Sequence, residues 1–138
     1  MIGRPAWPPY NRPVPETDLL VLEGMEFFGH HGDLDAEREL GSRLYIDVEI
    51  AADLSVAART DHLGDTLDYV QCFEIVRHVV EDGQHRLLET VAERVAAALL
   101  DQPRAGGVRV RVAKQPPIAG VIARTAVVVQ RGHGFAAR

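Results

Sequence analysis

The sequence predicts an α+β fold in which a four-stranded antiparallel sheet carries two helices on one face. Two observations lead to this prediction. Apolar residues alternate with polar ones in segments toward both ends of the 138-residue chain, which is the period of a β-strand. Between those segments, two consecutive stretches repeat their apolar residues at helical spacing. The expected order of elements is therefore ββααββ.

The first two strands are expected at residues 18–28 and within the segment RLYIDVEIAADLS, residues 43–55. The second strand alternates without a break, so it has one apolar face and one more polar face. The apolar set is Leu44, Ile46, Val48 and Ile50, and the opposite set is Tyr45, Asp47 and Glu49. A long loop or turn bounded by glycines, residues 29–41, is expected to join the two strands.

The two helices are expected in the middle of the chain. The segment YVQCFEIVRHVVEDG predicts a helix from about residue 69 that Gly83 ends, after a polar connector at residues 61–68. A second helix follows from about residue 87 to residue 100, with an apolar stripe along one side. The last two strands are expected at residues 108–114 and 121–131.

The length and composition indicate one globular domain, expected at residues 18–131. Residues 1–17 hold five of the eight prolines, which predicts an extended and weakly ordered arm. Residues 132–138 are expected to form a tail. Together these segments account for the whole chain.

Charge and composition disfavour several classes of partner. A formal net charge of −5 gives no general attraction to phosphate backbones, so we expect no nucleic acid partner. The single cysteine, Cys72, excludes an intrachain disulfide and a multi-cysteine zinc site. No apolar run approaches the length that spans a bilayer, so we expect no membrane segment and a cytoplasmic location. His30 and His31 are neighbours that point to opposite faces of an extended chain, and we expect no bound metal.

Lys114 ends the third strand on the same face as its valines, whereas Arg109 and Arg111 mark the other face as the solvated one. An ammonium group among valines loses hydration, which favours the neutral amine and suits the lysine to proton transfer. The alternative is a lysine whose stem covers apolar surface while its ammonium reaches water, and spacing alone favours this alternative. Two prolines, Pro116 and Pro117, must turn the chain sharply beside it.

Three other side chains are candidates for chemistry. Glu89, in the first turn of the second helix, could accept two parallel hydrogen bonds from an amidine-like group, but its position alone favours a surface residue that complements the helix dipole. Tyr69, where the first helix begins, could donate a hydrogen bond or a proton, although such a tyrosine more often packs its ring. Glu37 lies in an acidic loop and could simply be solvated.

Four segments together resemble the dihydroneopterin aldolase family, in order and in spacing. They are LEGMEFFGHHGDLDAERELG, DTLDYVQCFEIV, LLETVAERVA and VRVRVAKQPPIAG. The resemblance runs from about residue 19 to residue 131. It implies the tunnelling fold, whose subunits pair their sheets edge to edge into a ring, commonly a tetramer, with two rings stacked as an octamer. It also implies active sites between subunits.

The resemblance implies a retro-aldol reaction of folate synthesis, in which 7,8-dihydroneopterin is cleaved to 6-hydroxymethyl-7,8-dihydropterin and glycolaldehyde without a cofactor, metal or Schiff base. Carried over by position, Glu89 is the residue that anchors the pterin, and Lys114 relays protons near N5. Tyr69 is a proton donor, and Glu37 lies near the polyol side chain. The remaining substrate-binding residues implied are Leu88 beside Glu89 and, from the neighbouring subunit, Thr66, Leu67 and Asp68.

Three other activities stay open at this point. An epimerase would use the same cleavage and recombine the fragments; a triphosphate substrate would need several cations, for which Arg38 and Arg43 are the loop candidates. A non-catalytic pterin- or purine-binding module would use Glu89 alone. A class I aldolase would use Lys114 as a nucleophile. The chain also departs from common family patterns at His30 and Ala119.

Overall fold

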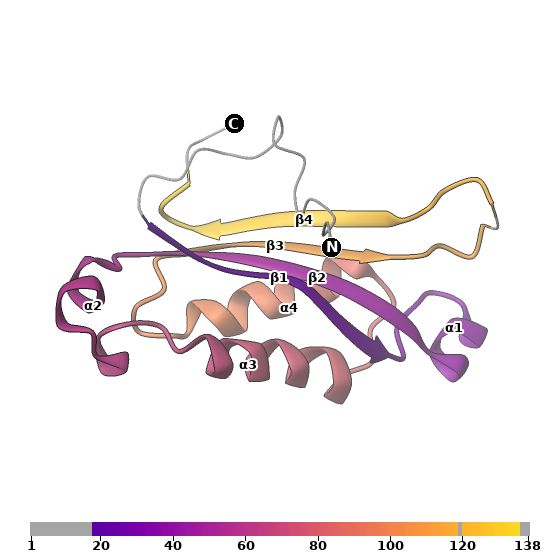
Figure 1. Cartoon of the computed structure of the whole chain (residues 1–138). Helices are drawn as coiled ribbons and strands as arrows, with labels where there is room; N and C mark the ends of the chain where they lie inside the picture. The colour runs from indigo at the N-terminus through magenta and orange to yellow at the C-terminus, as the bar shows by residue number, and fades with distance from the viewer. Residues whose placement is uncertain (1–17, 119, 136–138) are drawn as a thin grey trace, which may run out of the picture.

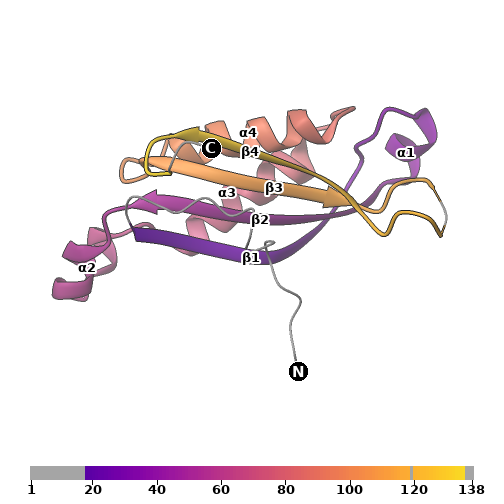
Figure 2. The same cartoon turned by 90° about the horizontal axis from the view of Figure 1, so that it is seen from above.

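The computed structural model describes residues 18–118 and 120–135, and the predicted sheet with two helices on one face is confirmed (Figure 1). The strands are β1 (Asp18–Gly29), β2 (Ser42–Ala52), β3 (Gly107–Lys114) and β4 (Thr125–Gly132), all antiparallel and hydrogen-bonded in the order β1-β2-β3-β4. The helices α3 (Tyr69–Asp82) and α4 (Leu88–Leu100) lie together beneath the sheet. Figure 2 shows the four strands side by side from above.

The core lies between the sheet and the two long helices. The alternating apolar residues of β2 and β3 supply its upper layer: Leu44, Ile46, Val48, Ile50, Val108, Val110 and Val112, all without exposed surface. The helices supply the lower layer from Cys72, Val76, Val80, Val91, Val95 and Leu99. Each fully buried aliphatic side chain contributes roughly 1.5–3 kcal/mol relative to its exposed state, so this single core can hold both layers.

The opposite face of the sheet is not the solvated face that the sequence predicted. Arg109 is only 2% exposed, and Asp47 and Glu49 are fully buried. In the register, Glu49 is directly opposite Arg109 and Asp47 is directly opposite Arg111, so each buried carboxylate lies across from a guanidinium group. The ion pairs measure 3.7 Å for Glu49–Arg109 and 3.6 Å for Asp47–Arg111. The alternation assigns these residues to the correct face of the sheet, but it does not tell whether the charged face is exposed to solvent.

Three short elements were not expected. They are the helices α1 (Asp35–Leu40) and α2 (Ser55–Thr60), and the 3-10 turn η2 (Leu63–Asp65). Each spans fewer than two helical turns, too few for a hydrophobic period to show. The end of α2 depends on Asp61, whose φ of 60° is left-handed and whose N–H donates to the Ala57 carbonyl. The expected loop and connector are thus partly helical.

Strand β4 begins at Thr125 and not at residue 121, so that prediction was wrong by four residues. Thr125 is the ladder partner of Lys114, the last residue of β3. The residues just before Thr125 belong to the turn that joins β3 to β4. Val121 is apolar but 80% exposed, so its side chain contributes to no core. The predicted arm at residues 1–17, Ala119 and the last residues of the predicted tail, 136–138, lie outside the described residues.

Candidate functional site

Lys114 lies at the end of β3, on the helix-facing side of the sheet, as its position after the valines predicted. Its partner in the ladder is Leu44, which has no exposed surface. The strand ends there because Pro116 and Pro117 follow and lack the N–H groups of a ladder. Lys114 is also the only lysine of the chain. One ammonium group is therefore placed at the rim of an otherwise apolar surface.

Glu37 is the partner that the sequence did not reveal. The Lys114 Nζ and Glu37 Oε2 atoms are 2.9 Å apart, although the two residues are 77 positions apart in the chain. Their side chains are 13% and 17% exposed, so water screens the pair only partly. The hydrogen bond from Lys114 is the largest cause that lowers the pKa of Glu37 below its ordinary value, and the Leu34 N–H adds to the effect. Two of the three predicted catalytic residues thus form one ion pair.

Glu37 lies in α1, and the Arg38 side chain fastens this short helix to the loop before it by hydrogen bonds to backbone carbonyls. Arg38 Nη1 donates to the Gly32 and Asp33 carbonyls, at 2.7 Å each, and Arg38 also pairs with Asp35. Gly32 has a φ of 153°, and a Cβ there would lie 2.5 Å from the Glu37 Cβ. Glycine at position 32 therefore lets the loop fold closely over Glu37.

Glu89 lies at the same end of the molecule as the Lys114–Glu37 pair. The Gly32 N–H donates to the His85 carbonyl at 3.0 Å, and His85 is four residues before Glu89 in the turn that leads into α4. Glu89 is exposed in the first turn of α4, as predicted, and Leu88 beside it is buried. Glu89 opens into a groove between α4 and β4 that includes neither Lys114 nor Glu37. The groove is lined by Glu89, Thr90, Glu93, Arg94, Ala97, Val129 and Arg131.

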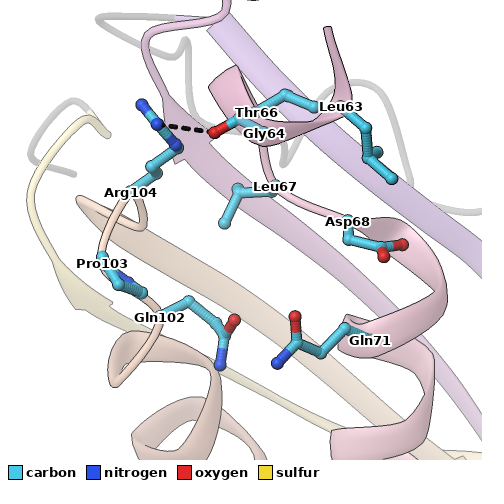
Figure 3. A pocket seen from close by; sticks show the side chains of 9 residues that line it. All are labelled: Leu63, Gly64, Thr66, Leu67, Asp68, Gln71, Gln102, Pro103 and Arg104. Atoms are coloured by element: carbon cyan, nitrogen blue, oxygen red, sulfur yellow. Dashed lines mark hydrogen bonds between the residues drawn. The ribbon is translucent and has the colours of Figure 1, made fainter.

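The remaining predicted residues, Thr66 to Tyr69, lie at the opposite end, where β3 begins. Thr66, Leu67 and Asp68, but not Tyr69, form one side of a pocket whose other side is Gln102, Pro103 and Arg104 (Figure 3). The pocket volume is about 690 Å³. Lys114 is the last residue of β3, seven residues after the first, so the length of the strand, roughly 25 Å, separates the two sets. One subunit does not bring Tyr69 to Lys114.

The segment that leads into α3 at this end is held by fewer side-chain hydrogen bonds than the Glu37 segment. Arg104 Nη2 donates to the Gly64 carbonyl at 2.8 Å, as the dashed line in Figure 3 marks. Asp68 caps α3 by accepting a hydrogen bond from the Val70 N–H at 2.9 Å, and Leu67 is part of the core. Tyr69, the first residue of α3, is 62% exposed. Its phenol therefore faces outward from this subunit.

Two histidines of the first loop have separate roles. His30 is exposed and its Nδ1 contacts the Arg38 carbonyl at 2.9 Å, whereas His31 is buried and bonds to the α3–α4 turn. Within residues 18–118 and 120–135, no cluster of three or more His, Cys, Asp or Glu side chains could hold a metal ion. No helix in this part of the chain is long and apolar enough to cross a membrane. Sequence reasoning did not predict that His31 is buried and bonded to Val80 and His85.

Comparison with known proteins gives one consistent family. A family model for dihydroneopterin aldolase matches residues 20–130. The dihydroneopterin aldolase of Bacillus subtilis (strain 168) is 38% identical over 117 residues, which cover 83% of this chain and 97% of that protein. The dihydroneopterin aldolase of Staphylococcus haemolyticus is 44% identical over 80 residues, which cover 58% of this chain and 95% of that protein.

Solved structures agree with the sequence comparisons. The E. coli dihydroneopterin aldolase in complex with neopterin has a TM-score of 0.78 and 32% identity, and the match covers 84% of this chain and 100% of that one. The dihydroneopterin aldolase of Burkholderia thailendensis bound to guanine has a TM-score of 0.71 and 26% identity, with 85% and 92% of the two chains covered. Both bound molecules are flat, nitrogen-rich heterocycles.

Proposed function

The chain belongs to the dihydroneopterin aldolase family, and from this premise we propose that it cleaves 7,8-dihydroneopterin at sites shared between two subunits. The products are 6-hydroxymethyl-7,8-dihydropterin and glycolaldehyde, a step of folate synthesis. The observation that carries the proposal is the Lys114–Glu37 pair, 2.9 Å apart at the same end of the fold as Glu89. An acid–base pair beside a carboxylate on a helix N-terminus suits a substrate with a flat heterocycle and a hydroxylated side chain.

The reaction needs proton transfers at three atoms. A base removes the proton of the 2′-hydroxyl, an acid protonates N5, and the C1′–C2′ bond breaks, with its electrons passing into the ring C=N to give an enamine. The enamine is then protonated at carbon. The same set of side chains serves both halves of the reaction.

Each predicted residue has a distinct part in this scheme. Glu89 accepts hydrogen bonds from the 2-amino group and the adjacent ring N–H, and Leu88 supports it from the core. Lys114 relays protons at N5, and Glu37, already paired with it, lies next to the polyol side chain. Tyr69 donates to the side-chain hydroxyl and to the enamine carbon.

The distance between the two ends supports a site shared by neighbouring subunits. Tyr69 is exposed at one end of the sheet, whereas Lys114 and Glu37 lie at the other end. A second subunit that brings its Thr66–Tyr69 segment to Lys114 completes the set, with Leu67 and Asp68 shaping that wall of the pocket. We propose a ring of four subunits, stacked in pairs as an octamer.

Two of the alternative activities are less compatible with the observed contacts. A class I aldolase needs a free amine, but the Lys114 ammonium is hydrogen-bonded to a carboxylate, and a protonated lysine has no lone pair for attack. A triphosphate substrate needs free cations. Arg38 is already bonded to Gly32 and Asp33, and Arg43 lies 3.5 Å from Glu26.

Product analysis tests the proposed reaction. The full chain is incubated with 7,8-dihydroneopterin, and the pterins are separated by chromatography while glycolaldehyde is measured independently. We expect equal amounts of 6-hydroxymethyl-7,8-dihydropterin and glycolaldehyde. Conversion to the 2′ epimer alone would identify an epimerase, and unchanged substrate bound by the protein would identify a binding module. Borohydride added during turnover is expected to leave Lys114, the only lysine, unmodified.

Subunit mixing tests the shared site. Tyr69→Phe and Lys114→Ala subunits, each inactive alone, are mixed under conditions that permit exchange. With random mixing in equal amounts, about one quarter of the sites combine an intact Tyr69 with an intact Lys114, so we expect about that share of the activity to return. No recovery after exchange has been demonstrated by mass spectrometry would assign the site to single chains. Wild-type subunits exchanged in the same way control for losses on handling.

A further inference from the structure

His31 is a buried histidine whose two ring nitrogens are both engaged. His31 is only 1% exposed, although it lies just after the end of β1 and just before a loop. A Cβ at Gly29 would lie 2.7 Å from the His31 ring, so the glycine at that position makes room for the imidazole. A polar ring buried so completely requires specific hydrogen-bond partners.

The partners define one tautomer of the ring. The His85 backbone N–H donates to His31 Nδ1 at 3.0 Å, so Nδ1 carries no proton. Nε2 lies 2.7 Å from the Val80 carbonyl and must be the protonated nitrogen, since a carbonyl can only accept. Both bonds exist together only in the neutral ring. Protonation of Nδ1 would set two N–H groups against each other and break the bond to His85.

These bonds join the two segments that carry the candidate site. His31 and Gly32 form a double link to His85, through His31 Nδ1 and through the Gly32 N–H that donates to the His85 carbonyl. On one side of this link, Gly32 packs against Glu37, the partner of Lys114. On the other side, the chain enters α4 and reaches Glu89. The link therefore connects the acid–base pair to the carboxylate that anchors the pterin.

We propose that His31 is a positioning residue, which in its neutral form holds the Glu37–Lys114 pair at the correct distance from Glu89. The inference rests on the proposed function, because the positioned groups are those that act on the substrate. His31 itself touches no reacting atom. Its loss would misplace the acid–base pair without removing any member of it, and a displacement of about 1 Å in an active site can lower the rate by about a hundredfold.

The surroundings of His31 oppose its protonation. Burial is the largest cause that lowers its pKa below the ordinary value, and the charges of His85, His30 and Lys114 lower it further, while the bond to Val80 acts in the opposite direction. The His85 ring stacks on it with centroids 5.4 Å apart. The other charged groups near this link are already paired: Glu37 with Lys114, and Asp33 with Arg86 at 3.5 Å. The link is therefore stable at neutral pH and breaks only in acid.

Two substitutions test the two hydrogen bonds of His31 one at a time. His31→Asn can keep an acceptor for the His85 N–H but does not reach Val80, whereas His31→Gln can keep the donor to Val80 and loses the acceptor. We expect His31→Gln to lower kcat by about tenfold or more while the Kd for neopterin changes by less than about threefold, since Glu89 stays on its helix. His31→Asn is expected to lose less, and its activity should extend to lower pH than that of the wild type because the amide does not titrate.

A matched control removes another contact between the same segments. Arg86→Gln breaks the exposed ion pair with Asp33, and exposed pairs contribute little, so kcat should stay within about twofold of wild type. The proposal is overturned if folded His31→Gln and His31→Asn both turn over at the wild-type rate. It is also overturned if His31→Gln weakens kcat and neopterin binding by the same factor, because that result indicates general loss of structure.

If the variants fail to fold, measurements on the wild-type protein still test the proposal. Ring nitrogen NMR reports the His31 tautomer, and hydrogen exchange of the His85 amide reports the link itself. Protonation of His31 Nδ1, faster exchange at His85 and loss of kcat are expected at the same acidic pH. A slow His85 amide while kcat falls contradicts the proposal. The wild-type assay separates the two hypotheses: absence of cleavage rejects the proposed function, whereas the NMR and exchange data still test the His31 link.

Discussion

The two ends of the sheet hold their candidate residues in different ways. At the end of β3, Glu37 and Lys114 are largely buried and bonded to each other, and the loop around them is bonded to the α3–α4 turn. At the start of β3, Tyr69 projects outward from a helix terminus that depends on a cap and one arginine contact. The first end is organised within one chain. The second end presents its phenol outward, as the proposed site between two subunits requires.

The largest effects should follow changes at the organised end. Lys114→Ala removes the proposed proton relay and should lower kcat by about 10²–10⁴-fold, with a small effect on the Kd for neopterin. Steady-state kinetics and calorimetry on the same preparation measure the two quantities. The substitution also leaves Glu37 without its cation, so circular dichroism is needed to show that the loop remains folded.

Glu89→Ala tests the other proposed role at this end, the binding of the pterin, and is compared directly with Lys114→Ala. Loss of two charge-assisted hydrogen bonds, each contributing roughly 1.5–3 kcal/mol, should raise the Kd for neopterin by about a hundredfold or more. Glu81, a carboxylate of α3 that lies 3.8 Å from Arg77 and outside the groove beside Glu89, offers a control as Glu81→Ala. Similar and mild effects of Lys114→Ala and Glu89→Ala on both quantities would remove the basis for assigning them different roles.

A smaller effect is expected at the opposite end. Asp68→Ala removes the cap of α3 and should lower the free energy of unfolding by about 1 kcal/mol, measured by urea denaturation. Asp68→Asn retains an acceptor for the Val70 N–H and should restore most of that loss. If Asp68 acts only as a cap, kcat per folded molecule will be the same in both variants. If kcat falls in Asp68→Asn with stability intact, the carboxylate contacts the substrate from the neighbouring subunit.

The sequence predicted regular elements well because their periods are local. The alternation in β2 and β3 set their faces, and the register then paired Asp47 with Arg111 and Glu49 with Arg109. That pairing could not be read from one strand, because it depends on which residues lie opposite each other. The same limit applies to β4, where exposed Val121 resembles strand sequence but precedes the first paired residue.

The candidate site was predicted residue by residue but not as an arrangement. Lys114, Glu89, Tyr69 and Glu37 were candidates from their places in the sequence, and the family resemblance gave each of them a role. The pairing of Lys114 with Glu37 depends on α1, a helix too short to have a visible period, and on the contacts of the loop before it. Long-range contacts of this kind arise from packing.

The smallest effect concerns pH and the Glu37–Lys114 pair. The hydrogen bond from Lys114 lowers the pKa of Glu37 in the folded state relative to the unfolded chain. A carboxyl with a lowered folded pKa stabilises the protein fully above its unfolded pKa, about 4.3, and that contribution is lost as the pH falls through the folded value. The free energy of unfolding of wild type should therefore exceed that of Glu37→Gln by up to about 1 kcal/mol at neutral pH. The difference should shrink steadily below about pH 4, and denaturation curves across this range measure it. A difference that is unchanged by acid would mean that the carboxylate charge does not stabilise this end, and that the loop is held by its backbone contacts alone.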